Sequence, residues 1–292
     1  MLKQSKDTAI IRSGDEQISV TDVLNGKHDT ALKYLSQYAA LSAVVYEKND
    51  NAKKLFPDTL KKWSILDLEF DSYRPNKKGK WVKELKVASY YKHEGGITYV
   101  TIIFRGTRFK KWRDWYANFN WITRFIPLVH NAYEQTILQI DTYIEAIENH
   151  LIEQNIAEST ENIKFISAGH SLGGGLAQQA AYASHRIETV YAYDPSPVTG
   201  YHSLSKSKRQ QNCEGLKIYR IWEHGEVLLY LRHITKTARK LSFSPNINPR
   251  IVEVRFNFVE HENAVKEHNM ANLASALIQI EKTLEDTAEP FK

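Results

Sequence analysis

Apolar residues recur along the chain in two periods, one typical of helices and one typical of strands. Helical spacing marks residues 29–46, where Asp29 can cap the start, and residues 130–149. Short β-rich runs occupy residues 85–92, 96–106, 162–169, 188–194, 215–222 and 250–260. Strand and helix patterns alternate through most of the chain. This order predicts an α/β fold with a mostly parallel central sheet and helices on both faces.

The organisation of the chain favours one domain over residues 1–292, because no repeat, low-complexity tract or flexible linker divides it. Residues 1–28 show no sustained period, and we expect a loosely attached arm with room for one short strand. Residues 284–292 are expected to form a C-terminal tail. The first residues lack the apolar stretch of a secretory signal, and no run approaches the length of a membrane span. We therefore expect a cytoplasmic protein as synthesised, with signal-independent export left open.

Composition narrows the function classes. The 292 residues are 42% hydrophobic and 25% charged, which excludes disordered and collagen-like chains. The formal charge of +5 is compatible with an anionic surface but too small to require nucleic acid. A single cysteine, Cys213, excludes an intramolecular disulfide framework and a cysteine-rich zinc site. Phosphate-loop, dinucleotide and zinc-protease motifs are absent from the sequence, so no cofactor or metal is expected.

The strongest chemical motif is Gly169-His170-Ser171-Leu172-Gly173, a G-x-S-x-G sequence that follows a predicted strand and precedes a helix-compatible segment. A serine at such a corner takes a strained backbone conformation that lifts its hydroxyl above the sheet edge. Side chains two positions away on either side would collide, which explains glycine at 169 and 173. Ser171 is therefore the candidate nucleophile.

A serine nucleophile needs a base and an acid that orients the base, in the chain order serine, acid, histidine for this type of corner. His268, just before the last predicted helix, is the candidate base, and His261 is its nearest rival. Glu226, on a glycine-containing turn after a strand, is the favoured acid. Asp194, at the end of the preceding strand, is the main alternative acid, and Glu223 is a weaker one.

Two N–H donors are needed to stabilise the oxyanion that forms when the serine attacks a carbonyl. The backbone N–H of Leu172, directly after the nucleophile, is the first candidate. The second is expected from the loop after an earlier strand, where Phe104-Arg105-Gly106-Thr107 places Thr107. The Thr107 hydroxyl offers a further donor.

Several of these motifs together resemble one family. The FRGT motif, Asp114-Trp115, the VHNAYEQTILQI segment, SAGHSLGGGLAQ, YRIWEHGEV and EHNMANLA resemble the class 3 lipases, over about residues 30 to 283. The resemblance implies the α/β-hydrolase fold with a lid segment and hydrolysis of lipid esters. It also implies Ser171 as nucleophile, His268 as base, an acid at position 226, and Thr107 with Leu172 at the oxyanion.

The sequence departs from the family pattern at three places. The family usually has aspartate where Glu226 stands, glycine where Ala132 stands, and a glycine-led turn where residues 194–197 read DPSP. The side chain of glutamate is longer than that of aspartate, so an acid at Glu226 needs a backbone that lies further from the histidine. The DPSP sequence in place of the glycine-led turn keeps Asp194 available as the acid.

Residues 108–128 combine seven aromatic side chains with five cationic ones. Tryptophan prefers membrane interfaces and Lys/Arg prefer anionic headgroups, so the segment is interpreted as a lid that meets a lipid surface. In the resembled family the lid occupies this position. The candidate substrate and lid residues are Trp112, Trp115, Tyr116, Phe119 and Trp121.

The sequence thus predicts a serine hydrolase of lipid esters, either a triacylglycerol lipase or a phospholipase A1-like enzyme, that works through an acyl-enzyme. Its expected partners are a lipid or ester substrate and a peripheral membrane surface reached through the lid. The alternative function is a catalytically silent hydrolase scaffold that binds lipid. Nucleic acid is not an expected partner, and head-group choice and oligomeric state are not encoded in any visible motif.

Overall fold

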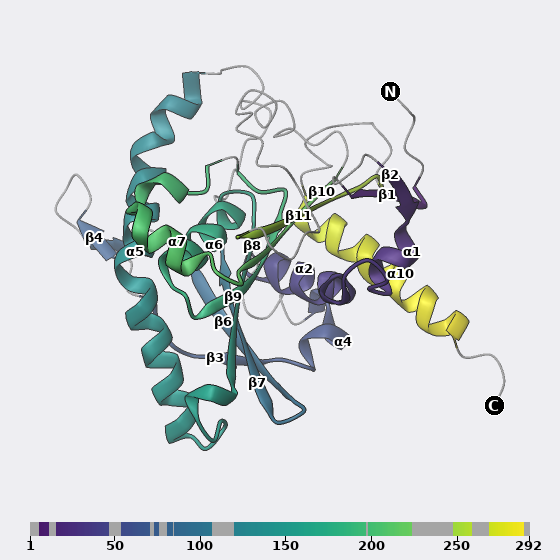
Figure 1. The fold of residues 1–292 in the computed structure, drawn as a ribbon, viewed down its shortest axis with the longest axis horizontal. Helices are drawn as coiled ribbons and strands as arrows, with labels where there is room; N and C mark the ends of the chain where they lie inside the picture. Colours follow the sequence, from purple (N-terminus) through teal and green to yellow (C-terminus); the bar gives the residue numbers. More distant parts are fainter. Residues whose placement is uncertain are drawn as a thin grey trace.

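A computed structural model gives the fold of the chain (Figure 1). The structure describes residues 6–11, 16–46, 54–70, 73–75, 81–83, 85–106, 120–196, 198–223, 248–258 and 269–288. Within these residues a nine-stranded sheet has the order β2-β1-β11-β10-β9-β8-β7-β6-β3. A separate pair of short strands, β4 (Tyr73–Pro75) and β5 (Trp81–Lys83), lies apart from it.

The centre of the sheet is parallel and its edges are antiparallel. Strands β7, β8, β9, β10 and β11 pair in parallel, and β6 and β3 at one edge and β1 and β2 at the other add antiparallel pairs. The strand bounds are β1 Thr8–Ile11, β2 Glu16–Ser19, β3 Ser64–Leu66, β6 Val87–Glu94, β7 Ile97–Phe104, β8 Ile163–His170, β9 Ile187–Tyr193, β10 Lys217–Glu223 and β11 Arg250–Phe256. Because parallel strands all run the same way, their carboxyl ends share one edge of the sheet.

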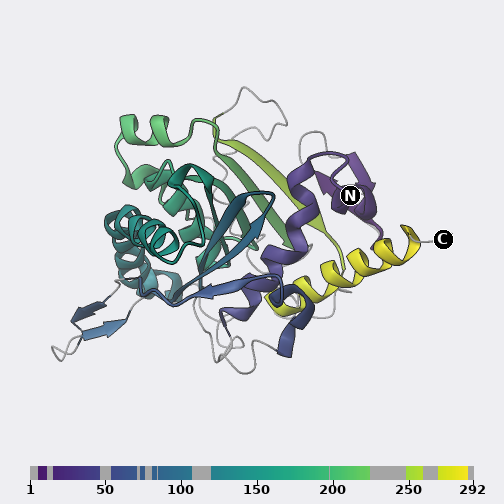
Figure 2. The same cartoon turned by 90° about the horizontal axis from the view of Figure 1, so that it is seen from below.

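Helices cover both faces of the sheet (Figures 1 and 2). One face packs against α1 (Val20–Leu24), the 3₁₀ turn η1 (Thr30–Tyr34), α2 (Leu35–Val44) and α10 (Met270–Ala288), and the other against α5 (Asn120–Glu153) and α6 (Leu172–Ala183). The short elements α4 (Pro57–Leu60), η3 (Thr160–Asn162), η4 (Tyr201–Ser203) and α7 (Lys206–Asn212) lie at the periphery.

Alternating side chains divide the core into two layers. On β9, Val190 and Ala192 pack on the α5 and α6 side, whereas Tyr191 and Tyr193 pack on the α2 and α10 side. All four are almost fully buried. The strand is therefore apolar on both faces, as expected for a parallel strand covered by helices on each side.

The predicted mostly parallel sheet is confirmed, and each β-rich run from residue 85 onward contains a strand. Three features differ from the expectation: the N-terminal segment, the start of α5 and the end of α10. The N-terminal segment contributes two strands rather than one, and β1 is paired with β11 with Ala9 fully buried, so it is firmly attached. Helix α5 begins at Asn120, inside the predicted lid, and α10 extends to Ala288, into the predicted tail. No helix in the described part of the chain is long and apolar enough to cross a membrane.

Candidate active site

Ser171 occupies the tight corner between β8 and α6. Its backbone has φ 59° and ψ −124°, a conformation that residues with a β-carbon rarely adopt. The side chain is partly exposed, as is that of Leu172, whereas His170 before it and Gly173 after it are buried. This is the geometry of a nucleophile elbow, in which backbone strain presents the serine hydroxyl at the carboxyl edge of the sheet.

Glycines at the corner allow backbone to pack directly on backbone. A β-carbon on Gly169 would lie 2.5 Å from the carbonyl carbon of Gly173, and one on Gly173 would overlap the carbonyl oxygen of Phe104. A β-carbon on Gly106 would lie 2.7 Å from the His170 carbonyl oxygen. The end of β7 and the elbow are therefore in contact, with no room for side chains at these three positions.

Helix α6 starts directly after the nucleophile. Leu172 is its first residue, and the first N–H groups of a helix have no acceptor within the helix. The positive end of the helix dipole lies at the same place. The Ser167 hydroxyl, on β8, donates to the Ala177 carbonyl at 2.9 Å and anchors the helix to the sheet. The Leu172 N–H thus lies at the N-terminus of α6, directly after Ser171.

Asp194 lies at the carboxyl end of the neighbouring strand β9. It is fully buried and also has a positive φ of 39°. One carboxylate oxygen accepts from the Glu223 N–H at 3.0 Å, and the other lies 3.9 Å from Nε2 of His170. The alternative acid is therefore held at the base of the elbow, between the ends of β8 and β10.

Glu223 connects the next two strand ends. It is the last residue of β10 and is 2% exposed, and its Oε1 accepts from the Phe258 N–H at 2.6 Å. Asp194 and Glu223 thus form a relay of side chain-to-backbone bonds from β9 through β10 to the segment after β11. Each bond satisfies a backbone donor at the edge where the strand ladder stops.

Tyr46, just after α2, contacts both loops that border the elbow. Its hydroxyl accepts from the Gly106 N–H at 3.0 Å and lies 3.2 Å from the His170 carbonyl oxygen and 3.3 Å from His170 Nδ1. Sequence reasoning missed this residue. Its partners are 60 and 124 positions away, and no local pattern distinguishes it from the other tyrosines.

The structure brings some predicted site residues together and does not describe others. Ser171, Leu172 and Asp194 gather at the carboxyl edge of the sheet, as expected of a catalytic centre in an open α/β fold. Trp121 lies in the first turn of α5. The remaining predicted residues lie outside the described part of the chain: Thr107, Trp112, Trp115, Tyr116, Phe119, Glu226, His261 and His268.

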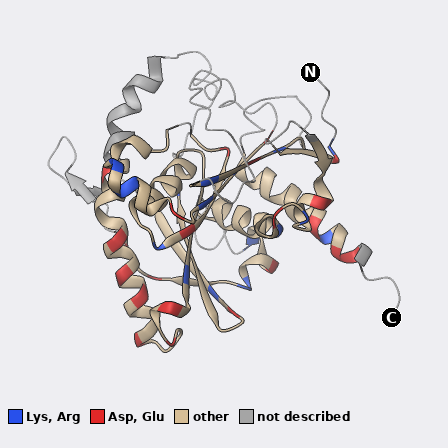
Figure 3. Ribbon diagram, in the orientation of Figure 1, with Lys and Arg blue, Asp and Glu red and all other residues tan. Residues whose placement is uncertain are grey.

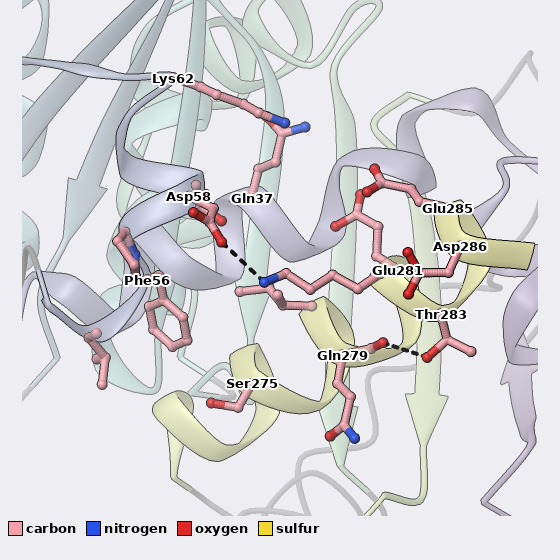
Figure 4. A pocket seen from close by; sticks show the side chains of 15 residues that line it. Gln37, Phe56, Asp58, Lys62, Ser275, Gln279, Glu281, Thr283, Glu285 and Asp286 are labelled. Atoms are coloured by element: carbon pink, nitrogen blue, oxygen red, sulfur yellow. Dashed lines mark hydrogen bonds and ion pairs between the residues drawn. The ribbon is translucent and has the colours of Figure 1, made fainter. Parts of the chain in front are cut away.

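A separate cavity of about 480 Å³ opens between α4 and α10 (Figure 4). Lys282 bridges it through an ion pair with Asp58 at 3.1 Å, and Glu281, Glu285 and Asp286 give it an acidic wall. Its described lining includes no histidine and no residue of the elbow. The cavity is therefore separate from the elbow, which remains the candidate active site.

Charge is unevenly distributed over the described surface. Acidic residues recur along α5, as Figure 3 shows. Two of them have cationic neighbours: Asp141 lies 3.8 Å from Lys208, and Glu148 lies 3.1 Å from Arg186. The charged residues of α5 are therefore predominantly acidic.

A family match covers most of the chain. Residues 37–239 match the phospholipase-like family described as the Tle-like phospholipase domain. The chain belongs to this family. The match confirms the predicted likeness to lipases and places the chain among phospholipase-like domains, a class of carboxylic ester hydrolases. The α/β-hydrolase fold predicted from the sequence agrees with the sheet order and with the elbow at β8. No curated protein sequence matches the chain.

Three solved lipase structures are similar to this domain. The Rhizomucor miehei lipase in its propeptide complex is 13% identical, with a TM-score of 0.41 over 69% of this chain and 63% of that one. Lipase II from Rhizopus niveus is 14% identical, with a TM-score of 0.39 over 71% and 76%. The nonglycosylated Yarrowia lipolytica LIP2 lipase is 15% identical, with a TM-score of 0.38 over 68% and 73%. The chain thus spans less than two thirds of the Rhizomucor protein.

Proposed function

We propose that this phospholipase-like domain hydrolyses carboxylic esters of lipids with Ser171 as the nucleophile. The observation that carries the proposal is the strained backbone of Ser171 at the corner between β8 and α6. A non-glycine residue in such a conformation costs stability of order 1–3 kcal/mol, and this strain persists where the geometry serves a function. The match to the phospholipase-like family supports lipid carboxylic esters as the substrate class.

The reaction proceeds through an acyl-enzyme. The Ser171 oxygen attacks the ester carbonyl carbon while the imidazole of His268 takes the hydroxyl proton. The tetrahedral oxyanion receives hydrogen bonds from the N–H groups of Leu172 and Thr107, each of which lowers the barrier by about 3 kcal/mol. The carbon–oxygen bond to the alcohol breaks, and His268 protonates the departing oxygen. Water then attacks the acyl group by the same steps in reverse and frees Ser171.

Two assignments in this mechanism draw support from the described residues. The Gly106 N–H is already bonded to Tyr46, so the next N–H along the chain, that of Thr107, is the proposed second donor. Glu226 is the proposed acid, and it follows β10 by three residues. Asp194 stays the alternative, since its carboxylate is buried beside the elbow although one oxygen is bonded to the Glu223 N–H.

The proposed substrates are acylglycerols or glycerophospholipids presented at a lipid surface, and the family description favours phospholipid. The aromatic and cationic residues of the lid, 108–128, are proposed to contact that surface, where tryptophan and arginine are favoured. The lid contributes Trp112, Trp115, Tyr116, Phe119 and Trp121 to substrate binding in this proposal.

The test combines a fluorophosphonate probe with turnover of tri-, mono- and phospho-acylglycerols. We expect wild-type labelling at Ser171 and a loss of about 10⁶ in kcat for Ser171→Ala. Ser203→Ala is the matched control, because Ser203 is exposed and lies in the short turn η4. Full labelling or undiminished turnover of Ser171→Ala contradicts the proposal. Vesicle binding by a wild-type protein that is neither labelled nor active supports the silent scaffold instead.

A further inference from the structure

Tyr46 connects the two chain segments that carry the proposed oxyanion donors. Helix α2 is buried against the sheet, and Tyr46 follows its last turn, so the side chain reaches the carboxyl edge of β7 and β8. Gly106, its first partner, precedes Thr107. His170, its second partner, precedes Ser171 and Leu172. One hydroxyl therefore contacts the chain segment that precedes each proposed oxyanion donor. The hydroxyl is not itself one of these donors.

The hydrogen-bonding capacity of a phenol fits this arrangement. A tyrosine hydroxyl donates one hydrogen bond and accepts through its lone pairs. Here it accepts from the Gly106 N–H and donates toward His170, whose carbonyl oxygen and Nδ1 lie 3.2 and 3.3 Å away. Burial raises the pKa of Tyr46 well above its usual value, so the hydroxyl keeps the proton that it donates. The rings of Tyr46 and His170 also meet edge to face at 5.8 Å.

We propose that Tyr46 is a positioning residue that holds the Gly106 end of β7 in register with the elbow that carries Ser171 and Leu172, an inference that rests on the proposed function. Gly106 and the elbow already meet at backbone contact distance, which fixes how near they approach. The Tyr46 hydroxyl adds the direction, because its hydrogen bond fixes the orientation of the Gly106 N–H relative to the elbow. Oxyanion donors act at about 2.7–3.1 Å from the oxyanion, so a small displacement of the chain there weakens catalysis.

The decisive variant is Tyr46→Phe, compared with Tyr191→Phe. Tyr191 is a suitable control because it is buried on the same face of the sheet and its hydroxyl also donates to a backbone carbonyl, that of Ala31, at 2.9 Å. Both variants lose one such bond, but only Tyr46 reaches the elbow. We expect Tyr46→Phe to lower kcat by about 10- to 100-fold with KM changed less than about threefold, and Tyr191→Phe to keep both near wild type.

A second measurement detects the same loss of oxyanion stabilisation and needs no substrate turnover. The rate constant for fluorophosphonate labelling of Ser171 should fall in Tyr46→Phe in parallel with kcat, because the phosphonyl oxygen occupies the oxyanion site. Amide hydrogen exchange should quicken in peptides that contain Gly106 and leave those of Tyr191 unchanged. Equal kcat values and equal exchange for Tyr46→Phe and Tyr191→Phe overturn the proposal.

These results separate the inference from the proposed function. A wild-type protein that is labelled and active, with Tyr46→Phe unimpaired, overturns the positioning role and leaves the hydrolase intact. A wild-type protein that is neither labelled nor active overturns the hydrolase, and the catalytic role of Tyr46 falls with it. In that case faster exchange at Gly106 in Tyr46→Phe still shows that the hydroxyl holds the loop.

Discussion

The backbone N–H of Ser196 donates to the carbonyl oxygen of Ser171 at 2.9 Å. The loop after β9 therefore holds the strained elbow through its backbone. The loop reaches this position because Asp194 turns the chain with a positive φ and its own N–H donates to Ile221 at 2.7 Å. The candidate nucleophile and the candidate acid are thus parts of one bonded corner, and a change at Asp194 acts on Ser171 through the backbone as well as through charge.

Replacing the two candidate acids with amides distinguishes their roles. If Glu226 orients His268, Glu226→Gln lowers kcat by about 10⁴, the loss seen when a triad acid becomes an amide. Asp194→Asn keeps an oxygen that accepts from the Glu223 N–H, so the corner survives and kcat should stay within about tenfold of wild type. The measurement is kcat on a soluble ester.

Thermal unfolding of both amide variants serves as the control, since local unfolding of the elbow would lower kcat even if the replaced acid did not orient the histidine. A loss of about 10⁴ for Asp194→Asn, with Glu226→Gln near wild type and both proteins folded, would assign the acid to Asp194 instead.

A methyl group at Gly173 should disrupt the contact between the elbow and β7. Its β-carbon would overlap the Phe104 carbonyl oxygen and lie 2.9 Å from the Gly106 nitrogen, and neither backbone group moves without breaking sheet or loop bonds. We expect Gly173→Ala to lower the free energy of unfolding by at least about 3 kcal/mol, measured by urea denaturation.

The control for Gly173→Ala is Gly95→Asn. Gly95 has a φ of 61°, a conformation that asparagine tolerates, and nothing lies within 4 Å of its β-carbon position. Its unfolding free energy should stay within about 1 kcal/mol of wild type. Equal stabilities for the two variants would show that the elbow and β7 are not in the contact described.

The sheet and the strained serine corner at its edge were predictable because their signals are local. Parallel strands buried on both faces form continuous apolar runs, and the run that ends at Gly169 is followed at once by the serine and its glycines. Each of these predictions required only the pattern of a few adjacent residues and no knowledge of tertiary contacts. The strand β1 lacks such a signal, since it joins the rest of the sheet through the pairing of Ile10 and Ile11 with β11, some 240 positions later in the chain.

The connections around the nucleophile depend on tertiary contacts and could not be predicted. Tyr46 meets Gly106 and His170 only because α2 packs beside the ends of β7 and β8. The relay from Asp194 through Glu223 to Phe258 likewise needs three strand ends side by side. A sequence shows which residues carry chemistry, whereas the bonds that orient them are set by strand order.

Asp29 joins the start of the 3₁₀ turn η1 to the sheet through a partly buried ion pair. Its Oδ1 accepts from the Ala31 N–H at 3.1 Å, and its Oδ2 accepts from the Tyr219 hydroxyl and lies 3.1 Å from Arg250. Asp29→Ala leaves the Arg250 guanidinium, 20% exposed, without this partner. We expect a loss of about 3 kcal/mol in the free energy of unfolding, measured in urea.

Two further variants separate charge from capping at this site. Asp29→Asn keeps an oxygen for the Ala31 N–H and should lose less than Asp29→Ala. Glu188→Ala removes an exposed partner of Lys164, with side chains 40% and 54% exposed, and should cost less than about 1 kcal/mol. A loss for Asp29→Ala no larger than that for Glu188→Ala would contradict a structural role for the pair.

Glu281 should make the stability of the protein depend on pH. Its carboxylate lies at the contact between α10 and α2, where it accepts from the Ser36 hydroxyl. Burial raises its pKa above the ordinary value of 4.5, and Glu285 adds to the rise. In the pH range between 4.5 and the raised pKa, the unfolded chain has already released this proton while the folded chain still holds it. Glu281 therefore lowers stability as pH rises through that range.

Glu281→Gln removes this titration and keeps an acceptor for Ser36, so the variant should gain stability relative to wild type as pH rises. We expect the difference in melting temperature, variant minus wild type, to be more positive at about pH 8 than at about pH 4. Glu188→Gln is the control, because Glu188 is exposed and faces Lys164. A difference that stays constant with pH, or that falls as pH rises, would mean that burial does not raise the pKa of Glu281 in the folded protein.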